Sequence, residues 1–451
     1  MSLWSRILQG MTAFSLDTVV SNVAAVLGAV LVFRYLDLPA YGRLTLALSL
    51  YAAATIFVNF GLGGVFTAEI ARSRGSGDLA RVKFLLSRYL YLNATTGALL
   101  FAAFVGVGIQ RGAPLWSVMG TYLLTTALNG VANVLFLSYT RYRRLAAQSI
   151  TRSLARLALL ATMPLWWQGD ALLGVAWTYP LMDCAALLVS VRLAKIALWD
   201  LQGVQTARYS FASLIDLFRQ QGIYATLSIP VKKVADQLPV WFLKALIGDV
   251  AVGIYGAAQK GFSLFFAFFR SLETTIFPLV SEQVEVDKER LQIALRQMQK
   301  YTFWLGLIVA VVGGLAAHWL MLIVAGEEYL AAVPVFRLML WNLVIYAFLQ
   351  SQRPLFYALG QQRWLFVMYV VSTATYALLL WAGISTLSVS GAIWAALINS
   401  GVFSGVRLFV LWRLEPQILI DPRSIFKVEG FDRRLWQIVR ERVAKHGVCE
   451  S

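Results

Sequence analysis

Residues 299–324 read QKYTFWLGLIVAVVGGLAAHWLMLIV, and after Lys300 this stretch contains no Asp, Glu, Lys or Arg. A transmembrane helix needs about 20 consecutive, mostly apolar residues. Open sheets and irregular chain cannot face lipid, because their backbone polar groups would lack partners there. The stretch therefore predicts a helix that crosses a membrane, and with it an α-helical membrane protein.

Similar stretches occur on both sides of this one. The chain of 451 residues is 59% apolar and 14% charged, whereas soluble domains have about 45–50% apolar and about 25% charged residues. This composition excludes a soluble multidomain enzyme and a disordered chain. We predict twelve spans, at 15–36, 44–67, 85–108, 114–139, 150–168, 171–197, 222–247, 251–281, 299–324, 333–358, 364–386 and 390–412. The first span has no cleavage site of small residues before it, so we interpret it as a retained helix and not as a signal peptide.

Basic residues are concentrated in alternate connections between the predicted spans. The connections 68–84, 140–152, 192–221 and 282–300 each contain four Lys or Arg residues, whereas 246–250, 325–332 and 386–390 contain none. Cytoplasmic loops carry the excess of Lys and Arg in membrane proteins. The pattern predicts a multi-pass membrane protein with both termini in the cytoplasm. It also explains most of the net charge of +16, so we expect no nucleic-acid partner.

The connections on the opposite side are too short to form an external domain. A membrane glycosyltransferase, ligase or polymerase usually needs a sizeable extramembrane loop, so we do not expect an enzyme. Two Cys and two His residues without metal-ligand spacing predict neither a disulfide framework nor a metal site.

The chain divides into two halves of six spans each. Arg34-Tyr35-Leu36 is followed by a short turn and Gly42, and Lys244-Ala245-Leu246 is followed by a short turn and Gly253. Both halves start on the same side, so the repeats are parallel. We expect an N-terminal lobe at 1–197, a cytoplasmic linker at 198–221, a C-terminal lobe at 222–412 and a tail at 413–451.

Charged residues inside spans are costly and usually mark function. The densest group lies in span 222–247, where Lys232 and Lys233 precede Asp236 by about one helical turn. One carboxylate cannot neutralise two lysines, and the remaining positive charge favours an anionic ligand. The alternative is a Lys–Asp pair that only holds the fold together.

Further charged residues occur in the second half. Span 251–281 contains Lys260, which has no acid at helical spacing, and deeper in the span Arg270 and Glu273, which could instead form a structural ion pair. Arg353 lies in span 333–358. We predict a cationic cavity lined by Lys232, Lys233, Lys260, Arg270 and Arg353.

The embedded acids are candidates for coupling transport to H⁺ or Na⁺. These are Asp17, Asp183, Asp236 and Glu273, although Asp17 is close enough to the surface to be solvated. We expect no other cofactor. Arg34 and Lys244 occupy equivalent positions at the outer ends of their spans, which makes them candidates for an outer gate. From Asp432 onward the tail alternates apolar and basic residues as an amphipathic helix does, and such a helix either lies on the anionic leaflet or is merely solvated.

Several short motifs resemble the polysaccharide-biosynthesis flippases of the Wzx type, a branch of the multidrug/oligosaccharidyl-lipid/polysaccharide transporter superfamily. The resemblance covers about residues 10–412. The motifs are FRYL (33–36), YG (41–42), FGLG (60–63), EIAR (69–72), DQ (236–237), GIY (253–255), FPLVS (277–281), ALGQ (358–361) and SGAI (390–393).

The resemblance implies two six-helix lobes arranged in a V around a cationic cavity. It also implies a flippase of the bacterial inner membrane that moves an undecaprenyl-pyrophosphate-linked oligosaccharide from the cytoplasmic to the periplasmic leaflet by alternating access. The lipid-linked oligosaccharide would be its substrate, and other polysaccharide-assembly proteins are candidate partners. The alternative is a cation-coupled exporter of small drugs from the same superfamily, in which we would expect an acidic cavity instead.

Overall fold

The computed structural model describes residues 3–198, 203–204, 223–283, 288–349, 352, 355–356, 359 and 361–414. Helices are the regular structure of this part of the chain. The predicted linker 198–221 lies outside the described residues except for 198 and 203–204, and so does the tail beyond Leu414. The first half contains α1 (Leu3–Tyr35), α2 (Leu38–Asn59), α3 (Gly63–Gly75), α4 (Leu79–Gln110), α5 (Pro114–Ser138), α6 (Tyr142–Ala161), α7 (Met163–Trp166) and α8 (Ala171–Leu198). The second half contains α10 (Ile223–Leu246), α11 (Asp249–Gln283), α12 (Lys288–Val324), η2 (Glu327–Ala332), α13 (Val333–Leu349) and α15 (Gln362–Leu414).

The helices agree with the twelve predicted spans. Nine segments of the described residues have the length and apolarity of a membrane span. The longest, Arg363–Leu414, holds two of the predicted spans, because Ser388 interrupts the helix with φ 56° and ψ −136°. The remaining two predicted spans, 150–168 and 222–247, correspond to α6 and α10, which are 20 and 24 residues long but carry more charge.

Several helices begin or end at other residues than the predicted spans, and two of these differences bear on the site. We expected span 150–168, whereas α6 runs over Tyr142–Ala161 and therefore places Arg152 within the helix and not at the end of a loop. We expected span 44–67, whereas α2 begins at Leu38, directly after the turn. The early start of α2 has a local cause, since the Asp37 carboxylate accepts a hydrogen bond of 2.8 Å from the Ala40 N–H and Pro39 suits the first turn.

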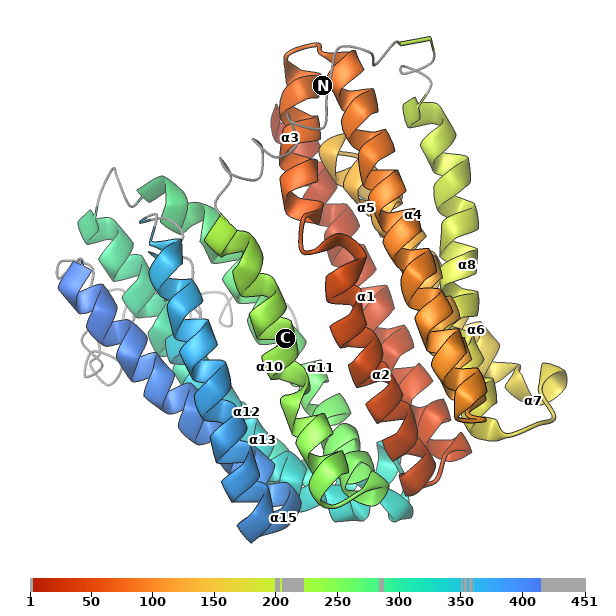
Figure 1. Cartoon of the computed structure of the whole chain (residues 1–451). Helices are drawn as coiled ribbons and strands as arrows, with labels where there is room; N and C mark the ends of the chain where they lie inside the picture. The colour runs from red at the N-terminus through yellow and green to blue at the C-terminus, as the bar shows by residue number, and fades with distance from the viewer. Residues whose placement is uncertain are drawn as a thin grey trace, which may run out of the picture.

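The helices form two lobes that lie side by side in a V (Figure 1). In the N-terminal lobe α4 packs on α5, α1 on α6, and α8 on both α5 and α6. In the C-terminal lobe α12 packs on α13, and α10 on α15. Helix α2 joins the lobes, because it packs against α10 and α11. We call the end where α1 turns into α2 and α10 turns into α11 the turn end; the lobes meet there and diverge toward the opposite end (Figure 1).

The lobes meet at the turn end through a reciprocal contact of two glycines. Gly42 and Gly253 are each the fifth residue of their helix, α2 and α11. A Cβ on Gly42 would overlap the backbone oxygen of Asp249, and a Cβ on Gly253 would overlap that of Leu38. Each glycine therefore lies against the first residue of the other helix, and only glycine allows the two backbones to approach this closely.

Aromatic side chains from both lobes strengthen the contact at the turn end. Phe33 of α1, Tyr41 of α2 and Tyr329 of η2 lie with ring centroids 4.8–5.9 Å apart. The buried Tyr329 hydroxyl also donates a hydrogen bond of 2.6 Å to the Leu36 backbone oxygen. These contacts close the space between the lobes at this end.

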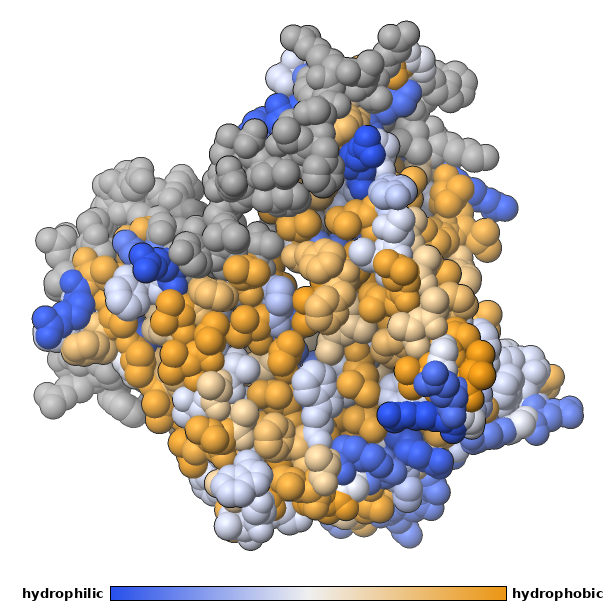
Figure 2. Space-filling view, viewed as in Figure 1, coloured by the Kyte–Doolittle hydropathy of each residue, from blue (hydrophilic) through white to orange (hydrophobic). Residues whose placement is uncertain are grey.

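The outer surface of the helices is apolar, as a membrane protein requires. Large apolar side chains are exposed along most of the long helices, among them Leu99, Leu188 and Leu315. Figure 2 shows apolar residues over the middle of both lobes and hydrophilic residues toward the two ends. The N-terminal lobe has a buried cluster of its own, whereas the main buried cluster of the C-terminal lobe also includes Ala29 and Phe33 of α1.

Candidate functional site

The predicted lysines of α10 lie on its exposed face. Lys232, Lys233 and Asp236 are all exposed. At about 1.5 Å per residue, Lys233 lies about 20 Å from the turn end, close to the middle of a membrane. Its Nζ is 3.4 Å from Thr55 Oγ1 of α2, so the side chain reaches from one lobe to the other. We call the surfaces that the two lobes turn toward each other, including the contact of α2 with α10 and α11, the cleft face.

Lys260 of α11 lies at a similar depth, about 16 Å from the turn end. The residue is half-buried. Among the residues that the structure describes, no carboxylate lies within ion-pair distance of Lys260 or Lys233.

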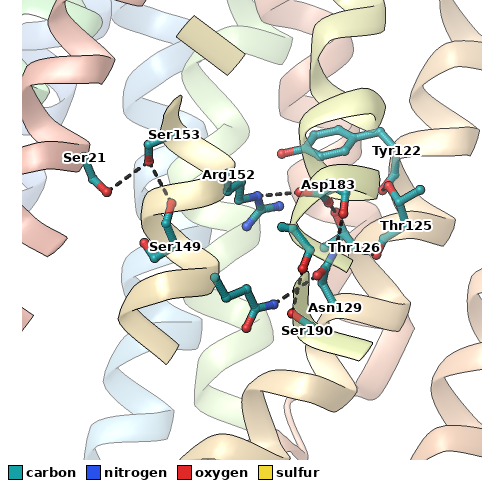
Figure 3. Close-up of polar contacts among 12 residues, drawn as sticks. Ser21, Tyr122, Thr125, Thr126, Asn129, Ser149, Arg152, Ser153, Asp183 and Ser190 are labelled. Carbon is teal, nitrogen blue, oxygen red and sulfur yellow. Dashed lines mark hydrogen bonds and ion pairs between the residues drawn. The ribbon is translucent and has the colours of Figure 1, made fainter. Parts of the chain in front are cut away.

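The N-terminal lobe contains a different arrangement, an ion pair between Arg152 of α6 and Asp183 of α8 (Figure 3). The Asp183 side chain is fully buried, whereas 34% of the Arg152 side chain is exposed. The second carboxylate oxygen, Oδ2, accepts a hydrogen bond of 2.6 Å from Thr126 Oγ1. Both oxygens of Asp183 are thus engaged by the lobe itself, which favours a structural role for this candidate coupling residue.

Polar residues continue from this pair into the core of the N-terminal lobe. Asn129 Nδ2 donates to the Asp183 backbone oxygen at 2.9 Å, and its Oδ1 accepts from Gln148 Nε2 at 3.0 Å. Tyr51 shares a hydrogen bond of 2.7 Å with Thr126 and stacks on Tyr122, with ring centroids 4.0 Å apart. The network ties α2, α5, α6 and α8 together around one buried carboxylate.

Arg156 lies one turn beyond Arg152 and has no acidic partner among the residues that the structure describes. Its Nη2 donates a hydrogen bond of 2.7 Å to the Tyr179 hydroxyl, and its guanidinium lies over the Tyr179 ring at 4.1 Å. Its Nε is buried without an acceptor. The side chain is therefore held in place by a neutral group, and its charge stays uncompensated within the described part of the chain.

Arg152 and Arg156 were not among the residues that we predicted for the site. The signal was present, because Arg144, Gln148, Arg152 and Arg156 recur every four residues and so share one face of α6. Arg144 donates to the Leu193 backbone oxygen at 3.0 Å, so every member of this row has a partner on α5 or α8. We missed the row because the predicted span began at residue 150.

The remaining predicted residues are distributed over the structure. Asp17 accepts a hydrogen bond of 2.8 Å from Ser21 on the same helix. Lys244 pairs with Asp249 at 2.7 Å and thereby closes the turn between α10 and α11, whereas Arg34 is exposed at the end of α1. Arg270 and Glu273 lie on α11, but their side chains are outside the described residues, as is the whole of Arg353.

Three cations from the two lobes therefore lack an acidic partner among the described residues: Lys233 and Lys260 of the C-terminal lobe, and Arg156 of the N-terminal lobe. A positive charge away from water is costly unless an opposite charge or water accompanies it. Phosphate groups bind well to Arg and Lys, since charge-assisted hydrogen bonds to their oxygens are short and strong. This arrangement is suited to bind an anion between the lobes.

Two family models match the chain. Residues 7–284 match the model described as polysaccharide biosynthesis protein, and residues 234–381 match the model described as MatE. No curated protein sequence matches the chain.

Solved structures with the same fold include transporters of two kinds. An inward-facing multidrug resistance MATE family transporter of the MOP superfamily aligns with a TM-score of 0.74 and 16% identity, over 90% of this chain and 98% of that one. The lipid II flippase MurJ, in an inward closed conformation, aligns with a TM-score of 0.66 and 11% identity, over 92% and 89%. A MOP superfamily transporter from Pyrococcus furiosus, whose description reports a binding pocket of reversed polarity and suggests a different function, aligns with a TM-score of 0.61 and 16% identity, over 94% and 95%.

Proposed function

Because the chain belongs to the polysaccharide biosynthesis protein family, with the fold of MOP superfamily transporters, we propose that it is a lipid-linked oligosaccharide flippase. Its substrate would be an undecaprenyl-pyrophosphate-linked glycan, and the reaction would be movement of that lipid from the cytoplasmic to the periplasmic leaflet. The family and the fold are those of transporters, so the lipid would be moved by a conformational change of the protein, without breaking a covalent bond.

The observation that carries this proposal is the sign of the charge on the cleft face. Lys233, Lys260 and Arg156 bring positive charge to the middle of the membrane from both lobes. A pyrophosphate head group would neutralise this charge in a region of low dielectric constant, where Coulomb attraction is strong. An exporter of cationic drugs would be expected to use carboxylates at the same place.

We propose an orientation in which the turn end faces the periplasm. The positive-inside rule supports it, since the basic connections 68–84 and 140–152 lie at the opposite end. The cleft would then be closed on the periplasmic side by the glycine contact and the aromatic cluster, and would open toward the cytoplasm. A reporter fused after Lys427 should then give a cytoplasmic signal, whereas a periplasmic signal would overturn this orientation.

If the flippase is coupled to an ion, we propose Asp236 as the coupling residue. Asp236 is exposed on α10, whereas the Asp183 side chain is fully buried in the N-terminal lobe. Transport by Asp236→Asn should lose its response to pH or Na⁺ gradients. A response that persists in Asp236→Asn would remove Asp236 from this role.

The flippase function is tested by surface glycan in cells that depend on this chain. Lys232→Ala, Lys233→Ala and Lys260→Ala are expected to lower surface glycan at normal protein abundance, because each removes a candidate contact to the head group. Arg111→Ala is the matched control, because Arg111 is an exposed cation at the turn end, away from the cleft face. Wild-type glycan in all three lysine variants would contradict the proposal.

The MatE match over residues 234–381 favours drug export as a second candidate function. The two functions predict opposite results in a drug test. An exporter should protect cells from cationic drugs, and its loss should leave surface glycan intact. A flippase should give no protection from drugs, and its loss should lower surface glycan. Drug sensitivity and surface glycan of a deletion strain therefore separate the two functions.

A further inference from the structure

A charged side chain interrupts an exposed, mostly apolar surface of the C-terminal lobe. Arg337 of α13 is exposed, together with Pro334 and Trp341 of the same helix. Positions three and four residues apart share one face of a helix. Val335 and Met339, two residues to either side of Arg337 and therefore on the opposite face, are buried in the core. Arg337 thus projects from a face of α13 that the lobe does not cover.

The neighbouring helix α12 holds the guanidinium of this arginine in place. Arg337 Nε donates a hydrogen bond of 2.9 Å to the Gly314 backbone oxygen of α12, and α12 packs along α13 (Figure 1). Gly314 leaves a notch in the surface, since no atom lies within 4 Å of a Cβ placed on it. The bond uses only Nε, so the two Nη groups of Arg337 keep their N–H donors for a ligand.

The surface around Arg337 has the composition of a surface that faces lipid. Trp319 of α12 and Trp341 of α13 are both exposed. The stretches Leu295–Val324 and Glu327–Tyr346 each have the length and apolarity of a membrane span. Trp side chains are enriched where lipid headgroups meet the hydrocarbon. We therefore expect lipid, and not bulk water, to cover Arg337.

The charge of Arg337 lies within the span and needs a partner there. Gly314 precedes Val324, the end of α12, by ten residues, which is about 15 Å along the helix. A charged side chain at such a depth is costly and is usually paired. No described carboxylate lies within ion-pair distance of Arg337, and this includes the exposed acids Glu327 and Glu328 of η2.

We propose that Arg337, held beside the notch at Gly314, binds the phosphodiester group of a membrane phospholipid. Its two Nη groups present a planar fork that matches two phosphate oxygens. The bilayer can thin locally, which brings a headgroup to an arginine at this depth. The exposed rings of Trp319 and Trp341 would lie against the glycerol and the acyl chains. This assignment does not depend on which substrate the protein transports.

The site is tested by native mass spectrometry of the purified full-length protein in detergent, titrated with phosphatidylglycerol. The wild type should retain a bound phosphatidylglycerol, and Arg337→Gln should weaken this binding at least about tenfold, because it removes a charge-assisted pair. Arg337→Lys should weaken it less, since it keeps the charge and loses the fork. Arg111→Gln makes the same change at an exposed arginine at the end of α4 and should bind as the wild type does. Equal binding by the wild type and Arg337→Gln would overturn the site.

Two competitors identify the ligand. Diacylglycerol has the acyl chains without the phosphate, and inorganic phosphate lacks the chains, so neither should displace phosphatidylglycerol at an equal concentration. Displacement by either one would overturn a phospholipid site. A dimer or a bound protein that is lost in Arg337→Gln, with lipid binding unchanged, would also overturn it and would make Arg337 a protein contact.

Arg337→Leu keeps the test decisive if the polar variant is poorly folded. Leucine suits an exposed position within a span, so this variant should unfold at or above the wild-type temperature in lipid-free detergent. Added phosphatidylglycerol should raise the unfolding temperature of the wild type and leave that of Arg337→Leu unchanged. Equal stabilisation of the two proteins would contradict the proposal. Earlier unfolding of Arg337→Leu without lipid would also contradict it, because the bond to Gly314 would then serve only to join α12 to α13.

Discussion

The two lobes differ in how charged side chains within the membrane are paired. In the N-terminal lobe, Arg152 is paired with a fully buried carboxylate, Asp183, which neighbouring helices also bind. In the C-terminal lobe, Lys233 and Lys260 point to the cleft face without a described carboxylate partner. Helices α6 and α10 are both too charged to resemble ordinary spans. Arg152 of α6 is paired with a fully buried carboxylate, whereas Lys233 of α10 lies beside the Thr55 hydroxyl.

The difference separates charge that holds helices together from charge that we propose binds a ligand. A buried pair satisfied by its own lobe adds little net stability but is costly to break. For the cations at the boundary between the two lobes, we propose a ligand that binds and leaves during transport. Arg156 belongs to the second group although it lies on the same helix as Arg152, because its partner Tyr179 is neutral.

The largest effect is expected from breaking the N-terminal pair. Asp183→Asn leaves the Arg152 charge without its acid and should lower the free energy of unfolding by about 3–5 kcal/mol. Thermal or denaturant unfolding in detergent measures this loss. Asp249→Asn is the control, because the Lys244–Asp249 pair is 39% and 27% exposed and should cost about 1 kcal/mol or less. Equal losses in the two variants would show that burial does not distinguish the pairs.

A smaller effect is expected where the two lobes touch. Gly42→Leu and Gly253→Leu each force a side chain against the backbone of the other lobe and should cost about 1–3 kcal/mol. Surface glycan should fall as well, because the turn end can no longer close. Gly106→Leu on α4 has open space around it and serves as the control in both measurements. Unchanged stability and glycan in Gly42→Leu would show that the lobes are not joined there.

One hydrogen bond across the lobes gives a smaller effect still. Tyr329→Phe removes the donor to the Leu36 carbonyl and should cost about 1 kcal/mol of unfolding free energy. Tyr91→Phe is the matched control, because the Tyr91 side chain is 66% exposed on α4. If both variants unfold at the wild-type temperature, the hydrogen bond contributes nothing to closure.

The smallest effect on stability is expected at the cleft face. Lys233→Ala removes an exposed side chain and should change the free energy of unfolding by no more than about 0.5 kcal/mol. Its surface glycan should nevertheless fall. Arg363→Ala, also exposed, should change neither quantity. A large loss of stability in Lys233→Ala would place Lys233 among the charges that hold helices together.

Most of the fold could be predicted from the sequence, because each lobe is made of long apolar stretches that have few alternatives in a bilayer. Gly42 and Gly253 were recognised as equivalent positions, but their contact was not. Sequence spacing shows that two helices begin alike, whereas only the packing of α2 on α11 shows that they cross.

The site was predicted less completely. Asp183 was recognised as an embedded acid, but its partner was not, because α6 begins about eight residues earlier than the apolar pattern indicates. The polar residues Arg144, Gln148 and Arg152 interrupt the apolar pattern of α6, because they bind groups of α5 and α8 and not water. Partners from other helices cannot be read from the spacing within one helix.

The charge of α6 also bears on how the chain enters the membrane. A single Arg near the centre of a helix raises the free energy of insertion by about 2.5–3.5 kcal/mol, and α6 carries Arg152 and Arg156 together. Insertion of α6 therefore depends on partners, which are the Asp183 carboxylate and Tyr179 hydroxyl of α8. Because α8 follows α6 in the chain, the partners of Arg152 and Arg156 are present only after α8 has been synthesised. We therefore expect the two helices to enter the bilayer together.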